Sequence, residues 1–273
     1  MKLGIGVFTD KLSHAWSQQQ SLLCVGLDPD PERIPPEIMA QPKPFLKFLT
    51  AIVDATHTHC AAFKPQFAHF AAQGRESELA ELMAYIASCY PAHVRILDAK
   101  RGDVGSTAAF YALEAYARYD ADTVTLNPYL GKEAIDPFLA YGDRGIVVLC
   151  RTSNPSSDWL QKVGEPPTYL RVAKSVSEWN TSGQCMLVAG ATYPEELAQI
   201  RAVVGDMPML VPGIGAQGGD LEAVLLNGMT ADKTGLLISS SRSILYASSG
   251  DDFAEQSAQE AKRLNDQINT IRL

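Results

Sequence analysis

The chain alternates short apolar runs with segments whose apolar positions recur at helical spacing. Eight apolar runs are rich in β-forming residues, and they cover 21–27, 60–66, 93–100, 122–128, 145–150, 184–190, 207–213 and 235–241. Helical patterning is clearest in 43–59, 76–90, 106–119 and 194–205. Strands that alternate with helices predict a parallel sheet. Eight such units in a chain of 273 residues predict an α/β fold that closes into a (β/α)8 TIM barrel.

No linker or shift in composition divides the chain, so we expect residues 1–273 to form a single barrel domain. The leading segment 8–20 is predicted to be an extra N-terminal helix that closes the bottom of the barrel. Segment 151–170, after the fifth strand, is the longest irregular stretch. Long loops in compact domains are often lids or binding loops, so this segment is either such a loop or a mere insertion.

The mouth of the predicted barrel collects polar residues from several strands. In barrels of this kind the active site lies at the carboxyl ends of the strands. The polar residues at those ends are Asp28, Lys64, Asp98, Lys100, Asn127, Ser153, Gln217 and Arg242. Charges from the first, second, third and eighth strands therefore converge on one opening, which indicates a functional site.

The stretch "LDAKRGDVGST" (97–107) places two acids and two bases at the end of the third strand. Because side chains alternate along a strand, Asp98 and Lys100 should point the same way, with Cα atoms roughly 6 to 7 Å apart. Taken alone, the stretch is equally consistent with a solvated turn that carries an incidental ion pair. The convergence of charges at the barrel mouth favours the functional interpretation.

A glycine-rich stretch, "GIGAQGG" (213–219), fits the G-x-G-x-x-G pattern of dinucleotide-binding folds. It follows the seventh strand, however, whereas a dinucleotide fold carries this pattern in its first turn between strand and helix. Together with "SSSRS" after the eighth strand, it is more typical of a barrel's phosphate site. Backbone N–H groups can line a phosphate there, and Arg242 can bind it with two hydrogen bonds. We therefore favour a phosphate monoester as the ligand.

Composition limits the classes of partner and the compartment that we expect for this protein. The formal net charge of −8 argues against a nucleic-acid or membrane surface, although a pocket can still be locally positive. No long apolar segment and no signal-peptide pattern is present, so we expect a cytoplasmic protein. The five cysteines are widely spaced and lack a C-x-x-C pair, which predicts reduced thiols, four of them in or beside apolar runs. The cluster His57, His59 and Cys60 suggests a metal only weakly, because no second ligand cluster completes it.

Several of these motifs together resemble one family. "LDAKRGDVGST" resembles the D-x-K-x-x-D motif of orotidine 5′-phosphate decarboxylases. Further signatures of that family occur in the same order, as "VGLDPD", "FKPQFAHF", "VAGATYPEEL", "LVPGIGAQGGD" and "SSSRSILYAS". The resemblance spans residues 21–246 and is nearest to the longer, bacterial subgroup. It implies a carboxy-lyase that converts orotidine 5′-monophosphate to UMP and CO₂, the last step of de novo pyrimidine nucleotide synthesis, without a cofactor or metal.

The resemblance also implies roles for individual residues. The catalytic array is Lys64, Asp98, Lys100 and Asp103, with Lys100 as the proton donor to C6 of the pyrimidine. The substrate-binding residues are Asp28, Thr107, Ser153, Pro212, Gln217, Gly218 and Arg242. Asp28 and Lys64 would hold ribose hydroxyls, Ser153 the pyrimidine edge, and Gln217, Gly218 and Arg242 the phosphate. Asp103 and Thr107 would act in the partner's site of a homodimer with shared active sites. The one departure beside the site is Val104, where isoleucine is common.

Three other functions are compatible with parts of the pattern. Sugar-phosphate decarboxylases and aldolases of the same superfamily bind Mg²⁺ through an acid at the end of the second strand, where this chain has Lys64. A non-catalytic phosphate-binding barrel would need neither Lys100 nor its aspartates. A Schiff-base aldolase is disfavoured because flanking carboxylates stabilise a protonated lysine rather than a nucleophilic amine.

Overall fold

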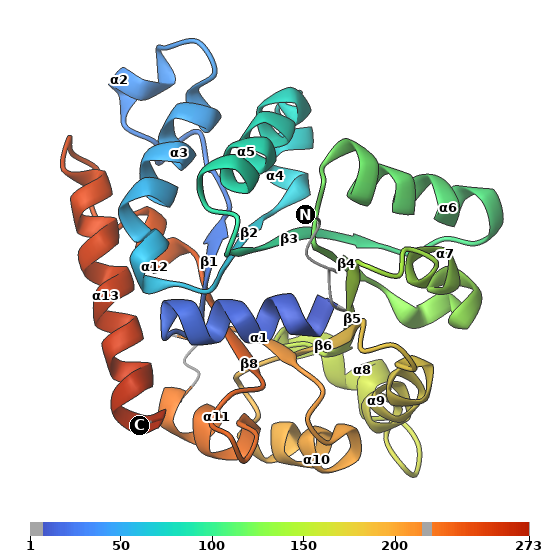
Figure 1. Cartoon of the computed structure of the whole chain (residues 1–273). Helices are drawn as coiled ribbons and strands as arrows, with labels where there is room; N and C mark the ends of the chain where they lie inside the picture. The colour runs from blue at the N-terminus through green and yellow to red at the C-terminus, as the bar shows by residue number, and fades with distance from the viewer. Residues whose placement is uncertain (1–7, 215–219, 273) are drawn as a thin grey trace, which may run out of the picture.

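The computed structural model describes residues 8–214 and 220–272. Its eight parallel strands form a closed barrel in the order β1 to β8, so that β8 pairs with β1. The strands are β1 Leu23–Leu27, β2 Ala62–Pro65, β3 Val94–Arg101, β4 Thr123–Leu126, β5 Gly145–Arg151, β6 Cys185–Ala189, β7 Met209–Pro212 and β8 Leu236–Ser240. Each lies within a predicted apolar run or ends one residue beyond it. The predicted TIM barrel is confirmed (Figure 1).

Helices surround the barrel. They are α1 Phe8–Gln19, α2 Pro36–Met39, α3 Pro44–Thr56, α4 Phe67–Ala71, α5 Glu76–Cys89, α6 Gly105–Leu113, α7 Asp136–Leu139, α8 Asp158–Gln161, α9 Thr168–Trp179, α10 Pro194–Val204, α11 Leu221–Gly228, α12 Arg242–Leu245 and α13 Phe253–Arg272. Short 3-10 turns occupy η1 His57–His59, η3 Pro128–Leu130, η4 Lys132–Ala134 and η5 Pro155–Ser157, and a π-helical turn, η2 Glu114–Arg118, extends α6.

The four segments with clear helical patterning are α3, α5, α6 and α10, as expected. The long final helix α13 and the helices α9 and α11 were not predicted. Segment 151–170 is less irregular than its sequence indicates, because η5, α8 and the start of α9 lie within it. The serines and prolines of this segment and the shortness of η5 and α8 hide these helices from a periodicity argument.

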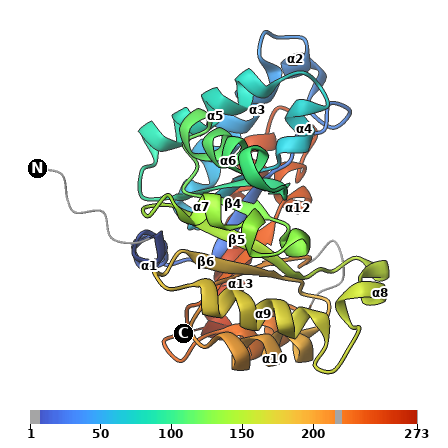
Figure 2. The ribbon, with the colours of Figure 1, turned by 90° about the vertical axis from the view of Figure 1, so that its right-hand side faces the viewer.

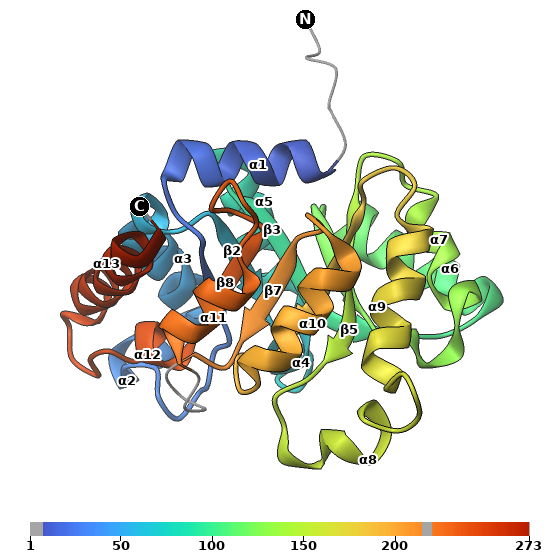
Figure 3. The same cartoon turned by 90° about the horizontal axis from the view of Figure 1, so that it is seen from below.

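The N-terminal helix α1 closes the bottom of the barrel, as predicted. Its residues Phe8 and Trp16 are buried, and the Phe8 ring fills the space where a Cβ on Gly145, at the start of β5, would lie. Lys11 forms an ion pair of 2.7 Å with Asp122, which precedes β4. Figures 2 and 3 show α1 and α8 at opposite ends of the barrel. The end that carries α8 is therefore left open as the mouth.

Four of the five cysteines lie in the core. Cys24, Cys60, Cys150 and Cys185 are buried free thiols, whereas Cys89 is exposed, which confirms the expected core positions. Burial raises the pKa of the Cys24 thiol to about 12, so this thiol is protonated at neutral pH. Within residues 8–214 and 220–272, no group of three His, Cys, Asp or Glu side chains is placed to hold a metal ion. None of the helices in these ranges is long and apolar enough to cross a bilayer.

Candidate active site

Four charged side chains meet at the barrel mouth. Asp98, on β3, is the centre of the cluster: its Oδ2 lies 2.9 Å from Nζ of Lys64, on β2, and its Oδ1 lies 2.6 Å from Nζ of Lys100. Lys64 also lies 3.8 Å from Oδ1 of Asp28, which directly follows β1. The convergence predicted for these four residues is therefore confirmed, and the array alternates in charge from one side chain to the next.

Burial distinguishes the two lysines. The Lys64 and Asp98 side chains are only 7% and 8% exposed, whereas the Lys100 side chain is 47% exposed. Burial by itself lowers the pKa of the Lys64 ammonium, but Asp28 and Asp98 outweigh it and hold that pKa well above its ordinary value. Burial by itself raises the pKa of the Asp98 carboxyl, but Lys64 and Lys100 outweigh it and hold that pKa well below its usual range. The buried pair is therefore charged at neutral pH.

The local backbone explains how Lys100 reaches Asp98. The pairing of β3 with β4 shifts register between Leu97 and Arg101, and Lys100 has a φ of 46°, in the left-handed region. Thr125, on β4, holds this irregular turn: its hydroxyl accepts from the backbone N–H groups of Ala99 and Lys100 and donates to Asp98 Oδ1 at 2.8 Å. The two side chains meet as predicted, but regular strand alternation does not describe the backbone that brings them together. Such a backbone for a non-glycine residue is typical of functional sites.

A cavity of about 220 Å³ opens beside this array. Its lining is polar and consists of Asp28, Lys64, Gln66, Asp98, Pro212, Gly213, Ile214, Ser239, Ser240, Ser241, Arg242 and Ser243. Five of these were singled out in the sequence. The run "SSSRS" was recognised in the sequence as part of a phosphate site, but only its arginine was assigned as a site residue, whereas its serines also line the cavity. Gln217 and Gly218, the other predicted phosphate ligands, lie outside the described residues.

The two sides of the cavity differ in what they offer a ligand. Asp28 Oδ1 is buried and accepts no hydrogen bond from the residues that the structure describes, so it is available to a hydroxyl group. Across the cavity, Arg242 begins α12 beside the serines of β8. A Cβ on Gly26, in β1, would lie 1.8 Å from the hydroxyl oxygen of Ser241, so a larger residue at that position would have to displace the Ser241 side chain. The cavity therefore presents a hydroxyl-binding carboxylate on one side and a cation with small hydroxyls on the other.

A family model described as orotidine 5′-phosphate decarboxylase / HUMPS family matches residues 21–256 of this chain. The chain belongs to this family. Two curated relatives named orotidine 5′-phosphate decarboxylase extend the match: the protein from Ralstonia pickettii (strain 12J) is 51% identical over 268 residues, and that from Cellvibrio japonicus (strain Ueda107) is 53% identical over 270 residues. In each case the alignment covers 97% of this chain and 99% of the relative.

Solved structures agree with this assignment. The OMP decarboxylase of Leishmania donovani superposes with a TM-score of 0.85 at 36% identity, over 97% of this chain and 99% of that one. The UMP synthase of the same organism gives a TM-score of 0.87 at 37% identity, over 98% of this chain, which spans 56% of that longer protein. The barrel of this family member is thus shared along its whole length with proteins of known fold.

Four of the predicted site residues that the structure describes do not line this cavity within one chain. They are Lys100, which contacts the lining residue Asp98, and Asp103, Thr107 and Ser153. Asp103 is half-buried, and its carboxylate accepts from the backbone N–H of Val104 at 2.8 Å. Thr107, on α6, is exposed. Ser153, two residues beyond β5, is half-buried against Gly190, where a Cβ would lie 2.9 Å from the Ser153 nitrogen. Asp103 and Thr107 thus lie outside the cavity of their own chain, and Ser153 lies on the loop that follows β5.

Proposed function

We propose that this protein removes CO₂ from orotidine 5′-monophosphate to give UMP, the last step of de novo pyrimidine nucleotide synthesis. The observation that carries the proposal is the buried Asp98 carboxylate, bound by the ammonium groups of both Lys64 and Lys100 at the edge of a polar cavity. Membership of the family and relatives at more than half identity support the same reaction. The chemistry needs no cofactor.

The phosphate, the ribose and the pyrimidine of the substrate would each contact a different part of the site. Its phosphate would lie at Arg242, among Pro212, the serines of β8 and the segment that contains Gln217 and Gly218. The ribose hydroxyls would bind Asp28, whose Oδ1 awaits a donor, and Lys64. This placement directs C6 of the pyrimidine toward Lys100, and Ser153 would contact the far edge of the ring. The half-exposed ammonium of Lys100 is then the group best placed to deliver a proton.

Electrostatics limits what Lys100 can do alone. Loss of CO₂ leaves electron density at C6, which a neighbouring ammonium stabilises before it donates its proton. Two unit charges 4 Å apart interact by about 4 kcal/mol at an effective dielectric of about 20. Enzymatic accelerations require ~8 to 23 kcal/mol. Binding energy from the phosphate and ribose must therefore also favour the transition state over the bound substrate.

The magnesium-dependent alternative is not favoured by the geometry. A sugar-phosphate decarboxylase or aldolase would need an acid at the end of β2, where a cation could bind. Lys64 occupies that place, and its ammonium already contacts both Asp28 and Asp98. A divalent ion there would face a buried positive charge, so a metal-free reaction fits this array better.

The proposed reaction is tested by following the absorbance of orotidylate in the presence of EDTA. We expect wild-type turnover to be unaffected by the chelator. The Lys100→Ala variant should lose kcat by more than about 100-fold while UMP binding is largely retained, because general acid catalysis is typically worth 10²–10⁴-fold. Reversible loss of activity on metal removal would instead support the magnesium-dependent reaction.

We also propose that the protein acts as a homodimer whose subunits complete each other's active sites. Exposed apolar side chains occur along α6 and in the turn after β4, and these residues, here called the apolar patch, are Val104, Phe110, Leu113, Tyr129 and Leu130. Exposed apolar patches often mark protein–protein interfaces. A second copy on this patch would cover Thr107 and lie close to Asp103. The proposal includes no nucleic-acid or membrane partner, and the cytoplasmic location stays a prediction.

Subunit complementation tests the shared site. If Asp103 acts in the partner's cavity, Lys100→Ala and Asp103→Ala chains are each inactive, but a mixed dimer has one intact site. With random exchange of equal amounts, about half of the dimers are mixed, so activity should approach roughly a quarter of that of the wild type. Subunit exchange is verified with two differently tagged chains. Activity no higher than that of the separate variants would place Asp103 in the site of its own chain.

A further inference from the structure

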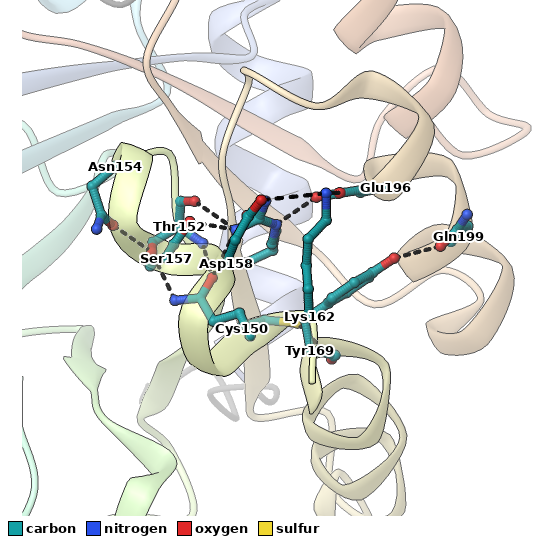
Figure 4. A network of polar contacts seen from close by, with 11 residues as sticks. Cys150, Thr152, Asn154, Ser157, Asp158, Lys162, Tyr169, Glu196 and Gln199 are labelled. Atoms are coloured by element: carbon teal, nitrogen blue, oxygen red, sulfur yellow. Dashed lines mark hydrogen bonds and ion pairs between the residues drawn. The ribbon is translucent and has the colours of Figure 1, made fainter. Parts of the chain in front are cut away.

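Arg151, the last residue of β5, is the centre of a polar network. Figure 4 shows the residues around it, among them Ser157, Asp158 and Glu196. The Arg151 side chain is only 1% exposed, although it carries a full charge. A buried guanidinium is costly unless its N–H groups are all satisfied, so its partners indicate what it holds in place. These partners come from the loop after β5 and from α10: they are Ser157, Asp158, Gln161 and Glu196.

The network ties that loop to the first turn of α10. Arg151 Nη2 donates to Asp158 Oδ1 at 2.6 Å, and its Nε donates to Glu196 on α10. Its guanidinium also stacks on the Tyr193 ring, 4.2 Å from the centroid. Lys162 completes the link with an ion pair of 2.8 Å to Glu196. Two cations and two carboxylates are thus balanced at the base of the loop, so the loop is fixed without depending on a ligand.

Gln161 extends this network to the residues that flank Ser153. Its Oε1 accepts from Arg151 Nη1 at 3.2 Å and from the backbone N–H of Thr152 at 2.9 Å. Its Nε2 donates to the Thr152 hydroxyl at 2.8 Å, and that hydroxyl donates to Asn154 Oδ1 at 2.7 Å. Both neighbours of Ser153 are therefore held through one amide side chain.

On its opposite side Ser153 packs against Gly190, which directly follows β6. The N–H of Gly190 donates to the Arg151 carbonyl at 2.7 Å, and Gly190 leaves no room for a Cβ beside Ser153. Ser153 is thus confined between Gly190 and the turn that Gln161 fixes. The contacts of Gln161 with Thr152 add nothing to the link between the loop and α10, which Arg151 already makes. They fix only the turn that carries Ser153.

We infer that Gln161, held by Arg151, is a positioning residue that sets the place of Ser153 and through it the recognition of the pyrimidine ring. This inference rests on the proposed function, in which Ser153 contacts the pyrimidine edge. It assigns specificity for the base to a side chain that does not touch the ligand. Recognition of the phosphate and ribose, on the other side of the cavity, is independent of Gln161.

The test is a double-mutant cycle with two ligands. Dissociation constants for UMP and for ribose 5-phosphate, which lacks the base, are measured by calorimetry for the wild type, Gln161→Ala, Ser153→Ala and the double variant. Since one hydrogen bond is worth about 0.5–1.5 kcal/mol, Gln161→Ala should lower the affinity for UMP by roughly 3- to 10-fold and leave the affinity for ribose 5-phosphate unchanged. In the Ser153→Ala background the same change should have no further effect on UMP, which is the signature of coupled residues.

Two further variants separate positioning from stability. Gln199→Ala removes an amide on α10 that accepts from the Tyr169 hydroxyl and, among the described residues, forms no hydrogen bond with Thr152, so the affinity for UMP should be unchanged. Gln161→Glu keeps an acceptor for Arg151 and for the Thr152 N–H, so it should recover most of the lost affinity. The inference would be overturned if Gln161→Ala lowered the affinity for UMP and for ribose 5-phosphate equally. It would also be overturned if Gln161→Ala lowered the affinity for UMP as much in the Ser153→Ala variant as in the wild type. A wild-type protein that binds UMP but does not consume orotidylate would contradict the proposed function instead.

Discussion

The buried lysine of the charged array offers the sharpest prediction, because a near-identical control lies beside it. Lys64 and Lys100 both contact Asp98, but only Lys64 is buried. Lys64→Met keeps most of the side-chain volume and removes the buried charge. Lys100→Met removes the half-exposed charge that contacts the other oxygen of the same carboxylate. Both variants should be inactive, so activity does not distinguish them. Their free energies of unfolding do, because the two lysines contact the same carboxylate and differ in burial.

The expected difference follows from what each variant leaves behind. Removing one partner of a buried ion pair costs about 3–5 kcal/mol when the other charge is left alone. In Lys64→Met, Asp98 keeps Lys100 and the Thr125 hydroxyl, so we expect roughly half of that cost, about 2 kcal/mol. In Lys100→Met, Asp98 keeps the buried ammonium of Lys64. Because an exposed ion pair is worth at most about 1 kcal/mol, we expect this variant to lose no more than that.

The pH dependence of the Lys64→Met effect has a definite sign. The pKa of Asp98 in the folded protein is depressed, so its stabilising contribution is complete above the pKa of the unfolded chain and is lost as the pH falls through the folded value. The pKa of Lys64 is raised, so its contribution is present below the ordinary lysine pKa of about 10.4 and fades only above it. The difference in stability between wild type and Lys64→Met should therefore be constant from about pH 5 to pH 9 and narrow below about pH 5.

Urea unfolding at a fixed protein concentration measures these free energies, because a fixed concentration keeps any contribution from association constant. The series is run at pH 7 and at several values between pH 5 and pH 3.5. A Lys64→Met variant as stable as Lys100→Met at pH 7 would refute the argument from burial. If the difference in free energy of unfolding between the wild type and Lys64→Met stays constant from pH 5 to pH 3.5, Lys64 stabilises the fold by packing rather than by charge.

Two further predictions concern the phosphate side of the cavity. Arg242→Ala should lower the affinity for UMP by roughly 10- to 150-fold and affect uridine much less, because a charge-assisted contact with the phosphate is worth ~1.5 to 3 kcal/mol. Equal losses of affinity for both ligands in calorimetry would show that Arg242 is not part of the phosphate site. Gly26→Ala should also weaken UMP, because its Cβ would displace Ser241 beside Arg242, whereas Gly142→Ala, which meets nothing within 4 Å, should bind UMP as the wild type does. Unchanged affinity in Gly26→Ala would show that Ser241 can move without disturbing the site.

Much of this architecture could be predicted from local pattern alone. Buried parallel strands are nearly continuous apolar runs, so all eight stood out, and the order of strands along the chain fixes which polar residues follow them. Asp28, Lys64 and Asp98 could therefore be assigned to one mouth without any structure. Short helices such as α8 could not, because their few residues carry no full helical period.

Other features depend on contacts between distant segments, and no local pattern encodes them. The approach of Lys100 to Asp98 looked like simple strand alternation, whereas it requires a register shift and the hydroxyl of Thr125 on the neighbouring strand. Arg151 was not singled out in the sequence, and its burial depends on a contact with Glu196, which lies 45 residues further along the chain. In both cases a polar side chain on the next strand or helix determines the local conformation.

These cases indicate how the charges of the mouth are divided between two tasks. Asp28, Lys64 and Asp98 line the cavity, and the strain at Lys100 is offset by the hydrogen bond that its backbone N–H donates to the Thr125 hydroxyl. Arg151 is more deeply buried than any of them, yet each of its three guanidinium nitrogens donates to a protein acceptor, and it does not line the cavity. A buried charge whose partners are complete holds a loop in place, whereas Asp28, whose buried oxygen lacks a hydrogen-bond donor among the described residues, is suited to bind a ligand. Completeness of partners, rather than burial or charge alone, therefore separates the positioning residues of this mouth from its binding residues.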